Sequence, residues 1–136
     1  MKMKFIRFND NAIIPVRKHY NDTGADIFML ENDYLAPNET KVIPLGFGID
    51  VPNGYTARIQ VRSSMAKQGL FIQQCAIDAG YKGEIHMIVT NIGKETIYWS
   101  KSDRLGYIEV YPCVYPELVE YLGDERGSGA FGSTGK

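Results

Sequence analysis

Apolar and polar residues alternate over short stretches of this chain. Every second residue from 55 to 61 is apolar, and the residues between them are polar. This is the pattern of a β-strand with one buried and one wet face, and Arg62 ends the strand on the wet face. Segments rich in Ile, Val, Tyr and Phe predict further strands over 4–8, 26–30, 41–50, 84–91 and 104–111. Only residues 63–68 predict a helix.

The predicted elements indicate an all-β domain. Seven or more short strands at this spacing are typical of a sandwich, a jelly roll or a small barrel. A chain of 136 residues suits one domain around a single core. The composition changes only after about Gly123, so we expect a domain over 1–123 and a separate arm over 124–136.

Charge and hydropathy narrow the range of partners. The chain has 15 Lys and Arg against 16 Asp and Glu, a net charge of −1. It therefore offers no broad cationic surface for nucleic acid, although a few arginines could hold a small anion. No apolar run approaches the roughly 20 residues of a membrane span, so we expect no membrane partner and a cytoplasmic protein. Cys75 and Cys113 lack metal-site spacing, and we expect both to be buried thiols.

The last twelve residues, ERGSGAFGSTGK, include four glycines. Glycine-rich backbone is costly to order, yet it can present successive N–H groups to an anion. Arg126, Ser133 and Thr134 would add donors, and the ring of Phe131 could cover a flat group. From composition alone, a phosphate-binding arm and an ordinary frayed terminus both stay open.

Polar residues also cluster at turns inside the chain. Arg62, Ser63 and Ser64 precede the predicted helix and combine a guanidinium with hydroxyl and helix-start N–H donors, which suits phosphate oxygens. The alternative is a serine helix cap beside a surface arginine. Asp78 follows an apolar pair and precedes a glycine turn. It could present a carboxylate from a hairpin or simply accept turn N–H groups.

Five such segments, taken in order, resemble the motifs of the trimeric dUTPase family. They are GADIF (24–28), RSSMAKQGL (62–70), AIDAGYKGE (76–84), SDRL (102–105) and RGSGAFGSTG (126–135). The resemblance covers nearly the whole chain. It implies a compact jelly-roll-like β-barrel with one short helix, a homotrimer with exchanged C-terminal arms, and hydrolysis of dUTP to dUMP and pyrophosphate.

The resemblance also implies roles for individual residues. Asp78 would orient and deprotonate the attacking water, and Tyr81 would lie beneath the deoxyribose and exclude a 2'-hydroxyl. The arm would close over a neighbouring subunit's nucleotide, with Phe131 covering the uracil. The residues implied in substrate binding are Arg62, Ser63, Ser64, Gln73, Gln74, Ile77, Tyr81, Arg126, Phe131, Gly132, Ser133 and Thr134. Those implied in support are Asp26, Gln68, Asp103, Arg104 and Tyr107, with Asp103 and Arg104 as an ion pair.

Family resemblance further implies a metal and a quaternary arrangement. The triphosphate would bind as its Mg2+ complex, with the ion held by phosphate oxygens and waters rather than by protein ligands. Each site would lie at a subunit boundary. Some phage-type members also bind repressor proteins, so a nucleotide-binding regulator with a protein partner stays open as an alternative.

The chain departs from the family pattern at several positions. Ile72 and Cys75 replace a usual Asn and Gly before the catalytic Asp, and Gln73 or Gln74 could compensate in reading the base. Tyr107 replaces the usual Gln of the fourth motif, where it could donate a hydrogen bond or only pack. Two milder changes are Val61 for Pro and Ala130 for Gly. A dCTP deaminase is disfavoured because it needs a glutamate at the position of Ile88 and lacks the glycine-rich arm.

Overall fold

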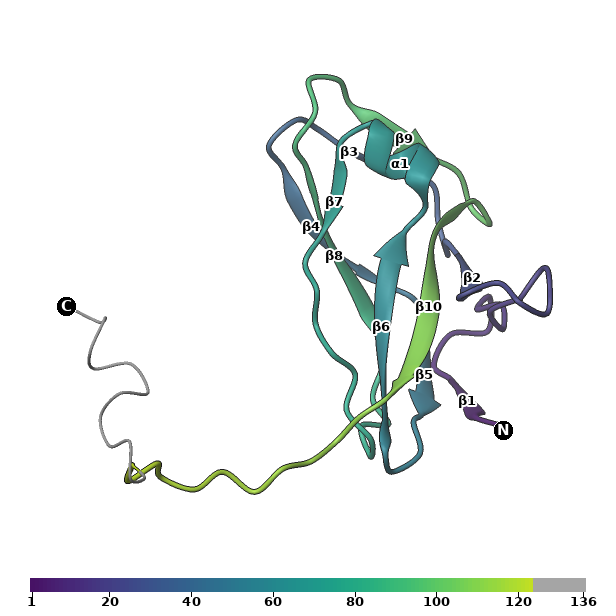
Figure 1. The fold of residues 1–136 in the computed structure, drawn as a ribbon. Helices are drawn as coiled ribbons and strands as arrows, with labels where there is room; N and C mark the ends of the chain where they lie inside the picture. The colour runs from purple at the N-terminus through teal and green to yellow at the C-terminus, as the bar shows by residue number, and fades with distance from the viewer. Residues whose placement is uncertain (124–136) are drawn as a thin grey trace.

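The computed structural model describes residues 1–123, which form a body of short strands with one short helix (Figure 1). The strands are β1 (Lys4–Arg7), β2 (Ala25–Phe28), β3 (Asp33–Leu35), β4 (Thr40–Pro44), β5 (Phe47–Asp50), β6 (Tyr55–Val61), β7 (Leu70–Ile72), β8 (His86–Asn91), β9 (Ile97–Trp99) and β10 (Arg104–Pro112), and the helix is α1 (Ser63–Lys67). The all-β prediction with one short helix is confirmed. The helix is far too short to cross a membrane, and no other helix occurs in residues 1–123.

The strands pair in four small sheets. Two are three-stranded, in the orders β2-β10-β6 and β4-β8-β7, and two are pairs, β1-β5 and β3-β9. Every pairing is antiparallel, and the described strands do not close into one continuous barrel. Side chains from all four sheets meet in a single apolar core, with Phe47, Ile27, Leu35, Leu45, Met87, Val51 and Val89 among its most deeply buried members.

Strand β6 and helix α1 follow the pattern read from the sequence. Ala57 and Ile59 are buried in the core, whereas Arg58 between them is exposed. The chain then turns at Arg62 into α1, and Met65 is the helix residue that reaches the core. Arg62 is the N-cap, and no side chain caps the helix; the serine-cap alternative is therefore not what the structure shows.

The predicted strand over 41–50 is in fact two strands. β4 ends at Pro44 and β5 begins at Phe47. Between them Gly46 has a φ of +77°, a left-handed conformation that glycine adopts without strain. A Cβ at this position would lie 2.9 Å from that of Asn9, so the corner needs glycine for both reasons.

The sequence missed the three shortest strands, β3, β7 and β9. Each has three residues, which is too short to show an alternating pattern.

The expectation of two buried thiols was wrong. Cys75 is exposed and Cys113 is half-buried. Cys75 lies in the link between β7 and β8, outside any strand, and Cys113 lies where the chain leaves β10. Their surroundings depend on where the paired strands end, which composition does not reveal.

Candidate active site

The hairpin between β7 and β8 presents Asp78. Ile77 forms a β-bridge with Ala57 of β6, with N···O distances of 2.8 and 3.1 Å. The Asp78 carbonyl then accepts a hydrogen bond from the Tyr81 N–H at 3.1 Å, which closes a turn in which Gly80 has a φ of +90°. The Asp78 side chain is exposed. The bridge therefore fixes the strand end from which a free carboxylate projects.

The same hairpin holds the ring of Tyr81. Its hydroxyl donates to the Glu84 carbonyl at 2.9 Å, and the ring lies close over Gly83, where an added Cβ would be 2.6 Å from the phenol oxygen. Tyr81 is nevertheless 48% exposed. A half-exposed aromatic ring fixed at its far end offers a flat surface on which a sugar or base can pack.

Asp78 and Tyr81 border a pocket of about 230 Å3. Its other walls are Ile59, Ile72, Gln73, Cys75, Ala76, Ile77, Glu84, Ile85, His86 and Ile88. The structure thus brings together Asp78, Tyr81, Gln73 and Ile77 as expected. Gln74 points elsewhere, since its Nε2 donates to Gln60 Oε1 at 2.7 Å.

Sequence reasoning did not assign the walls supplied by β8. Ile88 was considered only as the position where a deaminase needs a glutamate, and His86 was given no role in the site, yet both line the pocket. They are two residues apart on one strand, so they share a face, and this spacing was the available signal.

A second pocket, of about 260 Å3, includes four further predicted residues, Asp26, Arg62, Ser63 and Tyr107, whereas Ser64 does not line it. It is lined by Asp22, Thr23, Gly24, Asp26, Arg62, Ser63 and Tyr107. Asp26 of β2 and Tyr107 of β10 are directly paired, and Arg62 follows the end of β6. Its guanidinium donates to the Arg104 carbonyl at 3.1 Å. The register of β2-β10-β6 therefore brings these side chains together, in a cluster with the cationic and hydroxyl groups that suit phosphate.

Tyr107 packs against the backbone of the first motif. A Cβ on Gly24 would collide with the Tyr107 ring and would lie 2.8 Å from the Ile108 carbonyl oxygen. Glycine at position 24 therefore makes room for the ring that stands in place of the usual Gln. The structure shows the ring packing, and hydrogen bonding to the substrate by the Tyr107 hydroxyl stays a prediction.

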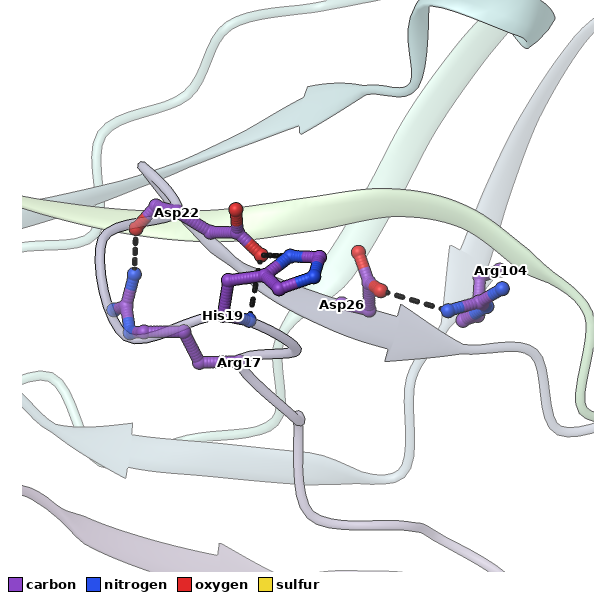
Figure 2. A network of polar contacts seen from close by, with 5 residues as sticks. All are labelled: Arg17, His19, Asp22, Asp26 and Arg104. Atoms are coloured by element: carbon purple, nitrogen blue, oxygen red, sulfur yellow. Dashed lines mark hydrogen bonds and ion pairs between the residues drawn. The ribbon is translucent and has the colours of Figure 1, made fainter.

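The expected ion pair between Asp103 and Arg104 does not form. Arg104 instead pairs with Asp26 at 3.0 Å, as Figure 2 shows, and the Asp103 carboxylate accepts the Ser100 N–H at 2.9 Å in the preceding turn. Adjacent residues at the start of a strand point to opposite sides, so Arg104 meets β2 while Asp103 faces the turn. Asp26, which was expected to order the cluster around Arg62, is paired with Arg104 instead.

The loop beside this pocket is held by a second polar cluster. Asp22 accepts hydrogen bonds from His19, at 2.9 Å from the backbone N and 3.3 Å from Nδ1, and Arg17 donates to the Asp22 carbonyl (Figure 2). The His19 N–H chiefly lowers the pKa of Asp22 below its ordinary value of 3.8, and the charges of His19 and Arg17 act in the same direction. The edge of the pocket therefore carries a carboxylate that stays ionised at neutral pH.

Asp78 and Arg62 lie at different levels along β6. Asp78 follows the residue bridged to Ala57, whereas Arg62 follows Val61 at the end of the strand, next to α1 (Figure 1). Five residues of extended strand span about 17 Å, and the two pockets share no lining residue. One copy of the chain therefore does not bring Asp78 and Arg62 together.

The remaining predicted residues lie elsewhere. Gln68 donates to the Ser64 carbonyl at 3.3 Å and lines neither pocket. Arg126, Phe131, Gly132, Ser133 and Thr134, with the whole of the predicted arm 124–136, lie outside the described residues.

Comparison with known proteins gives one consistent result. The dUTPase family model matches residues 10–135. The deoxyuridine 5'-triphosphate nucleotidohydrolase of Nautilia profundicola is 34% identical over 142 residues, which cover 100% of both chains. The dUTPase of Staphylococcus bacteriophage 80alpha with dUPNHPP has a TM-score of 0.84 at 26% identity and 99% coverage of each chain. A mutant dUTPase of phage phi11 of S. aureus, described with a structural Mg(II) ion, has a TM-score of 0.83 at 25% identity, covering 89% of this chain and 97% of that one.

The strand-rich fold and the matched residues place the chain in a class of nucleotide hydrolases. It belongs to the dUTPase family. The resemblance drawn from the five motifs and the assignment as an enzyme are both confirmed.

Proposed function

We propose that this chain hydrolyses dUTP to dUMP and pyrophosphate, with Asp78 as the general base. The observation that carries the proposal is the exposed Asp78 carboxylate beside a pocket floored by Tyr81, in a member of the dUTPase family. A water held by Asp78 would attack the α-phosphorus and give its proton to the carboxylate. The bond from that phosphorus to the bridging oxygen would break, and pyrophosphate would leave with the bonding electrons.

Tyr81 would set the preference for deoxyribose. Its phenol is tied to Glu84 and its ring rests over Gly83, so the ring cannot easily move away from a sugar packed on it. An added 2'-hydroxyl would then meet the ring face and lose its hydrogen bonds to water, which is costly without a new partner. UTP should therefore react far more slowly than dUTP.

The phosphates would be held by Arg62, Ser63 and Ser64 of a second copy. Within one copy these residues lie about 17 Å from Asp78 along β6, whereas the base and the phosphate ligands must act on the same nucleotide. We therefore propose a homotrimer with each site at a subunit boundary. The arm over 124–136 would complete the site from a neighbouring copy, with Arg126, Ser133 and Thr134 on the phosphates and Phe131 over the uracil.

The last described segment supports association. After β10 the chain runs away from the body (Figure 1), and Val114, Leu118 and Leu122 are 85%, 90% and 86% exposed. A run of exposed apolar side chains is unfavourable in water and marks a contact surface. A neighbouring copy would cover it.

A bound Mg2+ would fit this arrangement without a dedicated protein cluster. Residues 1–123 contain no group of three or more His, Cys, Asp or Glu able to hold a metal, and Asp26 in the phosphate pocket is already paired with Arg104. When bound to the triphosphate, the ion would neutralise part of its charge through phosphate oxygens and waters. Arg62 would neutralise a further part from the protein side.

The alternatives gain less support. Ile88 lines the pocket where a deaminase would need its glutamate, so the pocket lacks that proton carrier. A regulatory role is suggested only by analogy, since the phage 80alpha dUTPase is described as controlling the transfer of virulence genes. Binding of a second protein and location in the cytoplasm both stay predictions.

A substrate panel tests the proposal directly. Pyrophosphate release with Mg2+ should be fast for dUTP and slow for dCTP, dTTP and UTP. Equal turnover of dCTP would contradict the assigned base pocket, and equal turnover of UTP would contradict the role of Tyr81. No release from any deoxynucleotide would remove the proposed function itself.

A further inference from the structure

The outer face of β6 and β10 contains a buried carboxylate that the proposed reaction does not use. Glu109 lies in the middle of β10 and is only 4% exposed. A buried carboxylate must be hydrogen-bonded to be tolerated. Gln60 Nε2 donates to Glu109 Oε1 at 3.1 Å, and a hydrogen bond with Glu109 raises the pKa of Tyr111. In residues 1–123 no cationic side chain forms a salt bridge with Glu109.

The hydrogen bonds continue from Glu109 to the Asp78 hairpin. Glu109 Oε1 is the acceptor in this bond, so Gln60 turns its amide nitrogen to Glu109 and its carbonyl oxygen the other way. That oxygen accepts from Gln74 Nε2 at 2.7 Å. The acceptor oxygen of Glu109 therefore sets the orientation of both amides in turn.

Gln74 belongs to residues 73–77 of the hairpin, here called the 73–77 strip, whose middle makes few other hydrogen bonds. Before it, the Gln73 N–H donates to the Ile88 carbonyl at 2.8 Å, and after it, Ile77 exchanges two bonds with Ala57. Within the part of the chain that the structure describes, residues 74–76 make no backbone–backbone hydrogen bond. The Gln74 side chain therefore ties the middle of this strip to the sheet, between the backbone bonds at its two ends.

The strip is also a wall of the pocket beside Asp78. Gln73, Cys75 and Ala76 line it, while Gln74 turns back toward β6. The N–H and C=O groups left without backbone partners in 74–76 are donors and acceptors that can pair with the edge of a flat ring. Their use depends on the strip keeping one position.

We propose that Glu109 is a positioning residue for base recognition, which acts through Gln60 and Gln74 to fix the 73–77 strip. This inference rests on the proposed function, because it gives the strip the task of reading the uracil. The uracil edge presents two carbonyl acceptors around an N–H donor, whereas cytosine presents an amino donor beside a ring acceptor. A fixed strip can separate these patterns, and a loosened strip separates them less well.

The test compares Gln74→Ala, Gln60→Ala and Glu109→Gln with Tyr111→Phe as a matched control, which removes a neighbour of Glu109 but leaves the chain to Gln74 intact. Loss of one such hydrogen bond should raise the KM for dUTP by about 3- to 10-fold, with kcat within about twofold. The preference for dUTP over dCTP should fall by a similar factor. Glu109→Gln should have the smallest effect of the three, because an amide oxygen can still accept from Gln60.

Two further readouts separate positioning from general stability. The KM of the double variant Gln60→Ala/Gln74→Ala should be no higher than that of the more affected single variant, because both substitutions break the same series of hydrogen bonds. Hydrogen exchange of a peptide covering 73–77 should be faster in the three single variants than in the wild type and in Tyr111→Phe. Faster exchange throughout the protein, or additive losses, would indicate a structural role and overturn the inference.

The outcomes remain distinct from those of the proposed function. An active wild type whose variants keep the KM, the base preference and the exchange rate of the 73–77 strip overturns the inference alone. A wild type that does not hydrolyse dUTP overturns the proposed function and the base-reading task with it. In that case the exchange measurement still decides whether Glu109 anchors the strip.

Discussion

The two pockets of this chain are built in different ways. The phosphate pocket is made by paired strands, with Asp26 and Tyr107 in register and Arg104 bonded to Asp26. The pocket beside Asp78 is made largely by a link outside the strands, positioned by one β-bridge and by side-chain bonds from Tyr81 and Gln74. The phosphate pocket includes Arg62, which follows β6, and the Asp78 pocket includes Ile59 of β6.

This difference explains where the chain departs from its family. Ile72 and Cys75 belong to the walls of the Asp78 pocket, and Cys75 lies outside the strands, where a side chain can change without breaking a ladder of hydrogen bonds. Tyr107 lies in the centre of a paired sheet, and there the change is accommodated by the absence of a side chain at Gly24. A substitution within paired strands therefore requires a neighbouring residue that makes room for it, whereas a substitution in the link between β7 and β8 requires less adjustment of its neighbours.

The largest expected effect is on the rate of hydrolysis, at Asp78. Asp78→Asn should lower kcat by about 10²- to 10⁴-fold, because the amide cannot accept the proton of the attacking water. Binding of dUTP should change little, and calorimetric titration of the variant measures it. Asp10→Asn, an exposed carboxylate on another loop, is the control. An affinity loss that matched the rate loss would make Asp78 a binding residue instead.

The separation of the pockets predicts that two inactive variants rescue each other. Asp78→Asn and Arg62→Ala chains, unfolded together and refolded in equal amounts, should recover about a quarter of the wild-type rate. Each site takes Asp78 from one copy and Arg62 from another. Each of the two residues is intact in half of the chains, so both are intact in about a quarter of the sites. Sites formed within one copy would each carry a defect, and the mixture would then be no more active than its components.

The fit of Tyr107 against Gly24 can be tested through stability. Gly24→Ala should lower the free energy of unfolding by about 1–3 kcal/mol, because the added methyl overlaps the Tyr107 ring and the Ile108 carbonyl. Urea denaturation measures the loss. Gly54→Asn is the matched control, since nothing lies within 4 Å of a Cβ at that site and asparagine tolerates its φ of +89°. Equal losses at the two sites would remove the argument for Tyr107 packing.

The smallest effect concerns the loop at the edge of the phosphate pocket. Hydrogen bonding to His19 lowers the pKa of Asp22 below 3.8 in the folded chain. The stability that Asp22 contributes is therefore present above its pKa in the unfolded chain, and it is lost as the pH falls through its pKa in the folded chain. Asp22→Asn should therefore be slightly less stable than the wild type at pH 6, and the difference should vanish near pH 2. Thermal melts at both pH values show it. A difference that grew on acidification would contradict the sign.

The sequence determined the local features of this protein. Alternation from 55 to 61 gave β6 with Ala57 and Ile59 inside and Arg58 outside, because side chains of a strand point to opposite faces in turn. The segments resembling family motifs singled out Asp78, Tyr81 and Arg62 as candidate site residues, since such segments are short and contiguous. Strands of three residues, such as β7, were missed because so few residues show no period.

Only the tertiary structure decided which residues meet. Strand register paired Arg104 with Asp26 rather than with its neighbour Asp103, set Tyr107 against Gly24, and put Asp78 and Arg62 at different levels along one strand. It also buried Glu109 and connected it through Gln60 to the hairpin. These contacts join residues distant along the chain. The antiparallel pairing that creates them cannot be predicted from the sequence of either segment alone.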